Sequence, residues 1–563
     1  MQMNSKKRLG ELLVTSGVIT EEQLHQALEI QRKKGGKLGE VFVNEGFVTE
    51  EQIIKVLESQ LGIKSLDLSK FYIDPEAVKL VPENLSRKHS VLGVEFSGGQ
   101  LVLAMKDPLD YFALEDIKLA VQMPIKQAIS TEKAINDAIE RFYSKTIAEK
   151  AVKDFFKQYK EQNPKQNINE EKSNDDVNNA PIVRLINSVI ENAVRNNSSD
   201  IHIEPEESGV RIRIRVDGVL QVSMVTGLET MNAIVSRIKI MSGLNIAERR
   251  LPQDGRITYT FDNRRVDLRV STLPTTYGEK IVMRVLDKTN FLLSKDKLGF
   301  AKTDMEKFES MIGRPHGIIL VTGPTGSGKS STLYAMLNEL NDESKNIITL
   351  EDPVEYDLKG INQVQLNPKS GLTFAIGLRA ILRQDPDVIM VGEIRDRETA
   401  EIAIRSALTG HLVLSTLHTN DAPGAVSRIM DMGIDPFLIS SSVIGVIAQR
   451  LVRKICTFCR EGYKPDDRES KILRLSHDDN ITVYRGKGCP MCNGSGYKGR
   501  TAIFEIMVSN KNLRMLIDKA ATSDELRDAA VANQMVTLYD SCIQLVLRGQ
   551  TTVDELSRVA FSC

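Results

Sequence analysis

Hydrophobic and polar positions follow the same order twice in the first 60 residues. Residues 8–31 (RLGELLVTSGVITEEQLHQALEIQ) align without a gap with residues 37–60 (KLGEVFVNEGFVTEEQIIKVLESQ), and 12 of the 24 positions are identical. Each copy has aliphatic residues, then a glycine, Gly17 or Gly46, and then a Thr-x-x-Gln pattern that typically opens a helix. We therefore expect each repeat to form a short helix, a glycine turn and a second helix, and we assign 1–61 to one module.

The next stretch, residues 62–145, mixes strand and helix patterns. Val91–Met105 alternates between apolar and polar residues around a Gly98-Gly99 turn, which indicates a hairpin. Ser130–Tyr143 has the periodicity of an amphipathic helix. These features predict a small α/β domain. Residues 157–179 are rich in Lys, Gln, Asn, Glu and Asp and have almost no large apolar residue, so 146–179 is expected to be a flexible linker.

An α+β domain is predicted at residues 180–290. Pro181–Asn196 is apolar at helical spacing, and three alternating segments predict strands at Val210–Val216, Arg256–Phe261 and Val266–Ser271.

From Leu298 onward, short apolar strands alternate with helices, which favours an α/β core with a largely parallel sheet. This domain is assigned to 291–563, with a cysteine-bearing insertion at 453–500 and a mostly helical end. The fold class is therefore multidomain α/β.

Charge and apolar composition narrow the class of protein. Lys plus Arg total 74 and Asp plus Glu total 75 in 563 residues, so a nucleic-acid partner is not indicated. The first ten residues contain no apolar segment of a signal peptide, and no stretch reaches the roughly 18 apolar residues of a membrane span. A cytoplasmic protein is expected.

A nucleotide-binding loop follows the apolar strand GIILVTG at 317–323. The sequence matches G-x-x-x-x-G-K-[S/T] between a predicted strand and a predicted helix, and its glycines let backbone N–H groups surround phosphate oxygens. The lysine adds charge toward the β and γ phosphates, and the serine hydroxyl reaches Mg²⁺. The loop comprises Gly323, Pro324, Thr325, Gly326, Ser327, Gly328, Lys329, Ser330 and Ser331.

Acidic residues end two further apolar strands. Asp387-Val-Ile-Met-Val-Gly-Glu393 has the pattern of a Walker B strand, and its terminal glutamate suits a base that orients the attacking water. The segment IITLEDPVE brings Glu351, Asp352 and Glu355 toward the same sheet edge, where they would hold Mg²⁺ through water or activate water. A solvated acidic turn is the alternative.

Two histidines bracket the next predicted strand, in TGHLVLSTLH. His411 and His418 are seven residues apart and would point to opposite faces, so they are not expected to share a metal. A γ-phosphate sensor, a subunit contact and a buried structural histidine all remain open.

Four of the six cysteines form two C-x-x-C pairs, separated by 29 residues. In a chain without an export signal, this pattern indicates metal ligation before disulfides. We expect Cys456, Cys459, Cys489 and Cys492 to form a closed tetrahedral Zn²⁺ site.

The motifs GPTGSGKS, ITLEDPVEY, DPDVIMVGEIRD and TGHLVLSTLHTNDA occur in one order. In this order they resemble the type II secretion and type IV pilus assembly ATPases along nearly the whole chain. The resemblance implies a RecA-like P-loop ATPase core that uses ATP and Mg²⁺, an N2 domain at 180–290, a homohexamer, and a partner in the inner-membrane platform. Assembly and secretion members of the family often carry a tetracysteine module and the shorter retraction ATPases typically lack it, so the resemblance points to extension and not retraction.

The family also directs arginines of the N2 domain toward the phosphates. Arg211, Arg213 and Arg215 alternate with apolar residues, so one strand face would carry all three. Arg213 and Arg215 are the candidates for stabilising transition-state charge, and a solvated strand face is the alternative. Further candidates in the catalytic domain are Arg379, Arg383, Arg395 and Arg450.

The N-terminal repeats resemble a cyclic-di-GMP-binding module of the same family. Two quasi-symmetric half-sites suit a two-fold symmetric dinucleotide, although the second repeat opens with lysine where the pattern has arginine. The alternative is a helical docking module for the membrane platform. The predicted ligand residues are Arg8, Leu9, Gly10, Gly17, Gln31, Lys37, Leu38, Gly39, Gly46 and Gln60.

The sequence therefore predicts a cytoplasmic motor ATPase that drives type IV pilus assembly under cyclic-di-GMP control. A type II secretion ATPase is the alternative, and a nucleic-acid-translocating ring motor is disfavoured by the balanced charge. A cyclic-dinucleotide sensor with a degenerate ATPase is disfavoured by the intact Lys329, Ser330 and Glu393.

Overall fold

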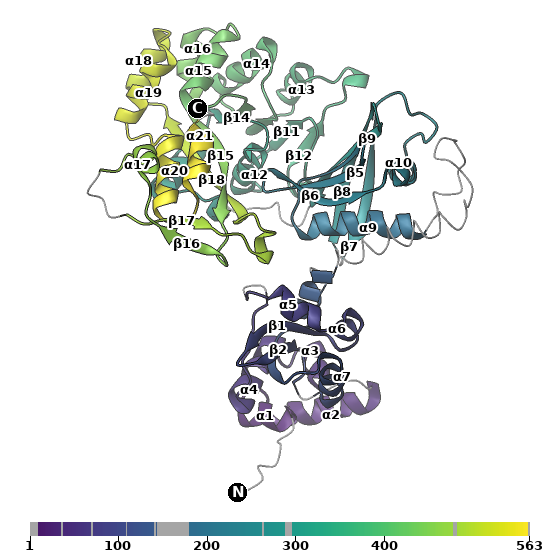
Figure 1. Ribbon diagram of the computed structural model, residues 1–563. Helices are drawn as coiled ribbons and strands as arrows, with labels where there is room; N and C mark the ends of the chain where they lie inside the picture. The colour runs from purple at the N-terminus through teal and green to yellow at the C-terminus, as the bar shows by residue number, and fades with distance from the viewer. Residues whose placement is uncertain are drawn as a thin grey trace.

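The structure is a computed structural model. The residues that it describes are 9–34, 38–68, 71–108, 110–139, 142–143, 180–261, 264–287, 295–476 and 481–560. Figure 1 shows the N-terminal helices and first small sheet in purple and dark blue, an antiparallel sheet in teal, and a large catalytic domain in green to yellow. The predicted linker at 146–179 lies outside the described residues.

Both N-terminal repeats form the predicted pairs of helices. The elements are α1 (Leu9–Thr15), α2 (Glu21–Lys34), α3 (Leu38–Asn44) and α4 (Glu50–Leu61). Thr20 and Thr49 close the predicted capping boxes: each hydroxyl accepts from the backbone N–H three residues on, and each backbone N–H donates to a glutamine side chain. The capping boxes therefore fix where the second helix of each pair begins.

The following domain packs helices around a three-stranded sheet. Its helices are α5 (Pro75–Leu80), α6 (Glu83–His89) and α7 (Tyr111–Val121), and its strands are β1 (Val91–Ser97), β2 (Gln100–Met105) and β3 (Ile125–Ile129). The β1–β2 hairpin confirms the predicted turn, and β3 pairs with β2 in parallel. Residues 132–139 and 142–143 are helical, inside the predicted helix.

The N2 domain is a six-stranded antiparallel sheet whose apolar face is covered by two helices. Strand order is β6-β5-β4-β9-β8-β7. The helices are α9 (Ala180–Arg195) and α10 (Met231–Ser242), and the strands are β4 (Asp200–Glu206), β5 (Gly209–Val216), β6 (Val219–Thr226), β7 (Gln253–Phe261), β8 (Arg264–Thr275) and β9 (Gly278–Asp287). Alternate residues of β4, β5 and β8 are buried under the helices, so the intervening polar residues share the opposite face.

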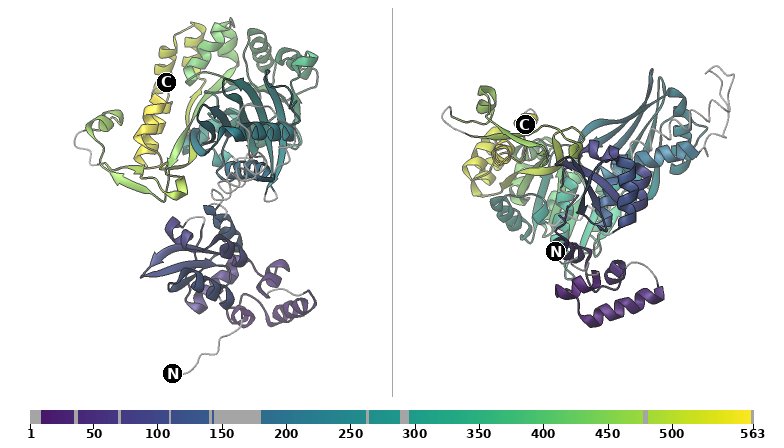
Figure 2. Two further views of the ribbon diagram at one scale, coloured as in Figure 1. Left: turned by 45° about the vertical axis from the view of Figure 1, so that its right-hand side comes forward. Right: turned by 60° about the horizontal axis from the view of Figure 1, so that its bottom comes forward.

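The catalytic domain is built on a seven-stranded sheet of order β12-β11-β13-β14-β10-β15-β18. All pairings are parallel except that of β15 with β18. The strands are β10 (Gly317–Thr322), β11 (Ile347–Glu351), β12 (Asn362–Gln365), β13 (Val388–Val391), β14 (Leu412–Leu417), β15 (Val443–Ile455) and β18 (Tyr497–Val508). The central strands are buried along their whole length, because helices cover both faces of the sheet (Figure 2).

Helices surround this sheet in chain order. They are α11 (Lys302–Ile312), α12 (Lys329–Leu340), α13 (Phe374–Ile381), α14 (Arg397–Leu408), α15 (Ala422–Asp431), α16 (Pro436–Ser442), α18 (Lys511–Asp518), α19 (Ser523–Ala532), α20 (Leu538–Leu547) and α21 (Val553–Ala560). The cysteine module, residues 453–500, runs from the end of β15 to the start of β18 and contains β16 (Arg460–Tyr463), α17 (Asp467–Ile472), β17 (Val483–Gly486) and η5 (Pro490–Cys492). Among the described residues, no helix is both long and apolar enough to span a membrane.

Candidate functional site

The motif residues meet at one edge of the catalytic sheet. Strands β10, β11, β13 and β14 are parallel neighbours, so their carboxyl ends share an edge, where ligands of open α/β sheets bind. Gly323, Asp352, Glu393 and His418 follow these four strands within two residues of their ends. Segments separated by almost 100 residues in sequence therefore deliver the predicted chemistry to one place.

The phosphate loop has the conformation that an anion cradle requires. Gly328 is the N-cap of α12 and has a left-handed φ of 92°, with no side-chain cap on the helix, so the first N–H groups of α12 remain available to phosphate. A Cβ at this position would lie 2.8 Å from the amide nitrogen of Gln449. The buried Ser327 hydroxyl has no hydrogen-bond partner. The loop thus fits a polyphosphate.

Lys329 is the first residue of α12, and its side chain bonds to the backbone of the phosphate loop. Its Nζ donates to the carbonyl oxygens of Gly323 and Pro324 at 2.7 and 3.0 Å. Burial lowers the pKa of the Lys329 ammonium to about 8; the Glu393 carboxylate opposes this shift and the Arg450 guanidinium adds to it. A phosphate would supply the negative charge that holds this ammonium protonated. The neighbouring Ser330 is exposed at the start of α12, where its hydroxyl is free to meet a cation.

Glu393 follows the end of β13 at the same sheet edge as the phosphate loop. Its side chain is 14% exposed and contacts Arg395 at 2.5 Å and His418 Nε2 at 3.4 Å. Its charge is also felt by Lys329. A partly buried carboxylate beside a phosphate loop, with one flank open, has the placement of a group that orients water.

The three carboxylates of the acidic segment have different surroundings. Glu351 is buried and accepts from the Tyr334 hydroxyl at 2.6 Å and from Thr349 at 2.6 Å, so its oxygens are occupied within the core. Asp352 is exposed, whereas Glu355 reaches across to Arg269 of the N2 domain at 3.2 Å. Asp352 is thus the member of the group that is open to a hydrated cation.

The two histidines lie at opposite ends of β14. His411 precedes the strand, and its Nδ1 is 2.9 Å from the carbonyl oxygen of Ser406, which ties the end of α14 to the sheet. His418 follows the strand and lies beside Glu393 at the catalytic edge. The separation agrees with the expectation that the pair does not share a metal.

The arginines singled out on β5 are paired within the N2 domain. Arg213 makes a two-pronged contact with Glu204 at 2.7 and 2.9 Å. Arg215 donates to the carbonyl oxygen of Gly218 at 3.0 Å and lies 3.4 Å from Asp200. Arg211 pairs with Glu206. Each of the three therefore has an acidic partner on the same sheet.

Arg269 is the N2 arginine that contacts the acidic segment of the catalytic domain, through Glu355, and the sequence analysis did not single it out. The register places Arg256, Arg269, Arg284, Asp200 and Arg215 side by side across β7, β8, β9, β4 and β5. This row carries four positive charges and one negative charge on a single face. The alternation in VDLRVST predicts that Arg269 lies on the polar face of its strand. Which residues lie beside Arg269 on the neighbouring strands depends on strand pairing, which the sequence does not give.

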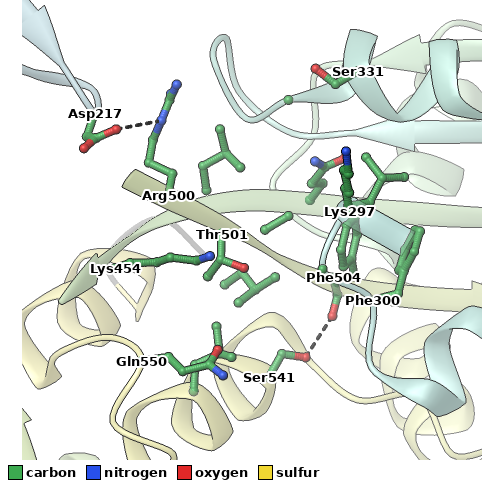
Figure 3. A pocket seen from close by; sticks show the side chains of 18 of the residues that line it. Asp217, Lys297, Phe300, Ser331, Lys454, Arg500, Thr501, Phe504, Ser541 and Gln550 are labelled. Carbon is green, nitrogen blue, oxygen red and sulfur yellow. Dashed lines mark hydrogen bonds and ion pairs between the residues drawn. The ribbon is translucent and has the colours of Figure 1, made fainter. Parts of the chain in front are cut away.

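A cavity of about 1100 Å³ extends from the phosphate loop between the N2 and catalytic domains (Figure 3). Gly328 and Ser331 border it at α12, and Phe300 and Phe504 stack with ring centroids 4.0 Å apart at its wall. Lys297, Arg284, Lys454 and Arg500 also line it. Aromatic and aliphatic walls with cationic groups nearby suit a nucleoside attached to phosphates.

The four predicted cysteines converge. Their sulfur atoms all lie within 4.8 Å of one another, with 3.8 Å between Cys456 and Cys489 and 3.9 Å between Cys459 and Cys492. Backbone N–H groups of Cys489 and Gly496 donate to the Cys492 sulfur, at 3.1 and 3.2 Å. Four thiols in this arrangement, stabilised by N–H donors, fit tetrahedral Zn²⁺. The long segment between the pairs is filled by β16, α17 and β17.

The glycines of the N-terminal repeats have structural causes. Gly17 and Gly46 have φ of 70° and 73° at the turns between the helices, a conformation that favours glycine. A Cβ on Gly10 would lie 2.5 Å from a methyl carbon of Leu24. The turn geometry therefore accounts for Gly17 and Gly46 without a ligand, and Gly10 lies close against the Leu24 side chain.

The remaining ligand candidates of the repeats are only partly described. Arg8 and Lys37 lie outside the described residues, and of Leu9 and Gln60 only the backbone is described. Leu38 and Gly39 open α3, and Gln31 lies in the last turn of α2.

Comparisons with known proteins agree with this site. A family described as "Type II/IV secretion system protein" matches residues 175–558, and one described as "MshEN domain" matches residues 61–149. The second match begins where the two repeats end. The first spans the N2 and catalytic domains.

Full-length relatives come from two branches. A type IV pilus assembly ATPase of Myxococcus xanthus is 44% identical, covering 98% of both chains. A type II secretion system protein E of Xanthomonas campestris is 41% identical, covering 99% of both. The X-ray structure of the Legionella pneumophila ATPase DotB covers 70% of this chain and 98% of its own, with a TM-score of 0.52 at 20% identity, which shows a shared fold. The chain belongs to the type II/IV secretion system ATPase family and is a P-loop ATPase.

Proposed function

We propose that this chain is the motor ATPase of type IV pilus assembly. The observation that carries the proposal is the convergence of Lys329, Glu393 and the N2 arginine Arg269 around one sheet edge. The full-length similarity to a pilus assembly ATPase supports the choice of machine. The motor works as a homohexamer in the cytoplasm, docked on an inner-membrane platform protein.

The residues divide the reaction between them. The α12 N-terminus and Lys329 bind the phosphates, Glu393 orients the attacking water, and His418 positions Glu393. The Ser330 hydroxyl and, through water, Asp352 would hold Mg²⁺, which would neutralise phosphate charge. Arg269 carries N2 movement to the acidic segment through Glu355, which couples hydrolysis to domain motion. Arg213 and Arg215, proposed from the sequence, would reach phosphate only by leaving their acidic partners.

Gene replacement tests the choice of machine. Cells that express Glu393→Gln as their sole copy should lose surface pili, whereas protein secretion should be unchanged and Glu343→Gln, an exposed acid between α12 and β11, should behave as the parent. Loss of secretion with pili intact would instead assign the chain to type II secretion, the branch of the Xanthomonas campestris relative.

We further propose that cyclic-di-GMP binds the paired repeats at residues 8–60 and regulates the motor. The two equivalent helical hairpins support this, because they offer quasi-symmetric half-sites, and the adjacent MshEN domain match supports it too. Calorimetry on the full chain should show saturable binding that Arg8→Ala abolishes and Arg32→Ala, an exposed arginine of α2, retains. Absence of heat at tens of micromolar ligand would leave a docking role for the repeats.

The cysteine module is proposed to hold one structural zinc ion. Elemental analysis should find about one equivalent per chain, and Cys489→Ser should lose it while Cys542→Ser, a buried cysteine outside the cluster, should retain it. A folded, metal-free parent protein would contradict this proposal.

A further inference from the structure

The N2 domain touches the catalytic domain at the cysteine module as well as at the acidic segment. The Gly499 N–H donates to Asp217 Oδ2 at 2.8 Å, and Arg500 Nε lies 3.5 Å from Asp217 Oδ1. Nearby, Asn493 Nδ2 donates to Asn196 Oδ1 at 3.1 Å. Three polar contacts thus join residues that are almost 300 positions apart in sequence.

Each side of this contact belongs to a regular element: a hairpin turn in the N2 domain and the start of β18 in the catalytic domain. Asp217 and Gly218 form the two-residue turn between β5 and β6, with φ of 49° and 84°, as in a type I′ hairpin. Arg215 donates to the Gly218 carbonyl oxygen and fastens that turn. On the other side, Gly499 lies at the start of β18, seven residues after Cys492. The Asp217 carboxylate therefore projects from one rigid turn onto another rigid segment.

The contact lies on the wall of the cavity of about 1100 Å³ that extends from the phosphate loop. Asp217 and Arg500 line that cavity together with Arg284 from β9 and Gly328 from the phosphate loop, and Figure 3 shows the Asp217–Arg500 pair at one end and Ser331 of α12 beyond it. Separation of Asp217 from Gly499 would open this wall between the domains. Because a carboxylate bound by an N–H donor is a charge-assisted hydrogen bond, one side chain is sufficient to bias such a separation.

We propose that Asp217 is a positioning residue, a latch that holds the N2 domain on the cysteine module and thereby closes the cavity around the nucleoside. This inference rests on the proposed ATPase function, with the base and ribose of ATP placed in that cavity. The latch gives the cysteine module a role in catalysis: the module supplies the fixed backbone donor that receives the N2 domain.

The principal test is Asp217→Gly in the full chain. Glycine adopts the left-handed turn at least as readily as aspartate, so the hairpin persists while the carboxylate is removed. Asp217→Asn also keeps the turn and an acceptor oxygen but removes the charge, and it should have an intermediate effect. Glu207→Ala is the matched control, because Glu207 is an exposed acid in the turn between β4 and β5 of the same sheet.

Two quantities are measured. Hydrogen–deuterium exchange of the nucleotide-free chain should become faster at Gly499 and Arg500 in Asp217→Gly, and not in Glu207→Ala. The dissociation constant of a fluorescent ATP analogue with Mg²⁺ should rise about fivefold or more in Asp217→Gly. Unchanged exchange at Gly499 would overturn the latch, and faster exchange with unchanged affinity would overturn its role in closing the cavity. Because exchange is recorded without nucleotide, a failure of ATP binding in the parent is detected separately.

Discussion

The catalytic sheet carries its charged site residues at one edge, whereas the N2 sheet carries its charged residues across one face. In the catalytic domain, parallel strands bring Lys329, Glu393 and His418 to one edge from separate motifs. In the N2 domain, antiparallel pairing places Arg269, Arg284 and Arg215 in one row, with Asp200 between the last two. A sequence motif therefore predicts which residues lie at the end of a strand. Which residues lie side by side across a sheet depends on the register of the paired strands, which a motif does not give.

The largest effect is expected at the catalytic edge. Lys329→Ala should lose nucleotide binding, because the cradle loses its buried ammonium. Glu393→Gln should bind ATP normally and lose turnover by a factor on the order of 10² or more, as expected for removal of a base. Phosphate release and nucleotide binding, measured on the same preparations with Glu343→Gln as the control, would separate the two roles. A Glu393→Gln protein with parental turnover would refute its assignment as the base.

A smaller effect distinguishes the two groups of N2 arginines. Arg269→Gln should lower turnover about tenfold because it removes a charged hydrogen bond to Glu355 across the domain boundary. Arg213→Gln should mainly lower the stability of the N2 domain, since its partner Glu204 lies in the same sheet. Steady-state ATPase rates and thermal unfolding of both variants test this division. Equal losses of turnover at similar stability would remove the distinction between them.

Acid should weaken the N2 sheet through Glu204. Burial disfavours the ionised carboxylate, but bonds from Arg213 and Lys280 outweigh burial and lower the pKa of Glu204 to about 2. A carboxyl pKa that is lower in the folded state stabilises the fold above the unfolded value of 4.5, and this contribution is lost as pH falls toward 2. Acid unfolding followed by circular dichroism should show Glu204→Gln less stable than the parent at pH 6 and equal to it near pH 2. A constant difference would contradict the pairing.

The smallest effect concerns the proton on Lys329. Because its pKa is about 8 in the free protein, part of the population is neutral at pH 8 to 9. Binding of a polyphosphate should restore the charge, so ATP binding should take up a fraction of a proton in this range and almost none at pH 6.5. Calorimetry in two buffers with different ionisation enthalpies measures this uptake. The same heat in both buffers at pH 8.5 would show that Lys329 is already fully protonated.

The sequence by itself determined the features that depend on neighbouring residues. The capping boxes at Thr20 and Thr49, the β1–β2 hairpin, the helix α9 and the strand, loop and helix around Lys329 all follow from local spacing. Because β10 ends at Thr322 and α12 begins at Lys329, the phosphate loop lies within one short segment, and its position could be predicted without the rest of the chain. The two C-x-x-C pairs likewise predicted a cluster of four cysteines, and the fold brings their sulfur atoms together.

Only the tertiary structure decided which charged side chains meet. Period-two alternation shows that Arg213 and Arg269 each lie on the polar face of the N2 sheet. Strand register pairs Arg213 with Glu204, whereas domain docking pairs Arg269 with Glu355. Packing also showed that Gly10 makes room for Leu24, which a repeated sequence alone cannot distinguish from ligand contact. Local propensities act over a few residues, whereas these pairings depend on the relative placement of segments far apart in the chain.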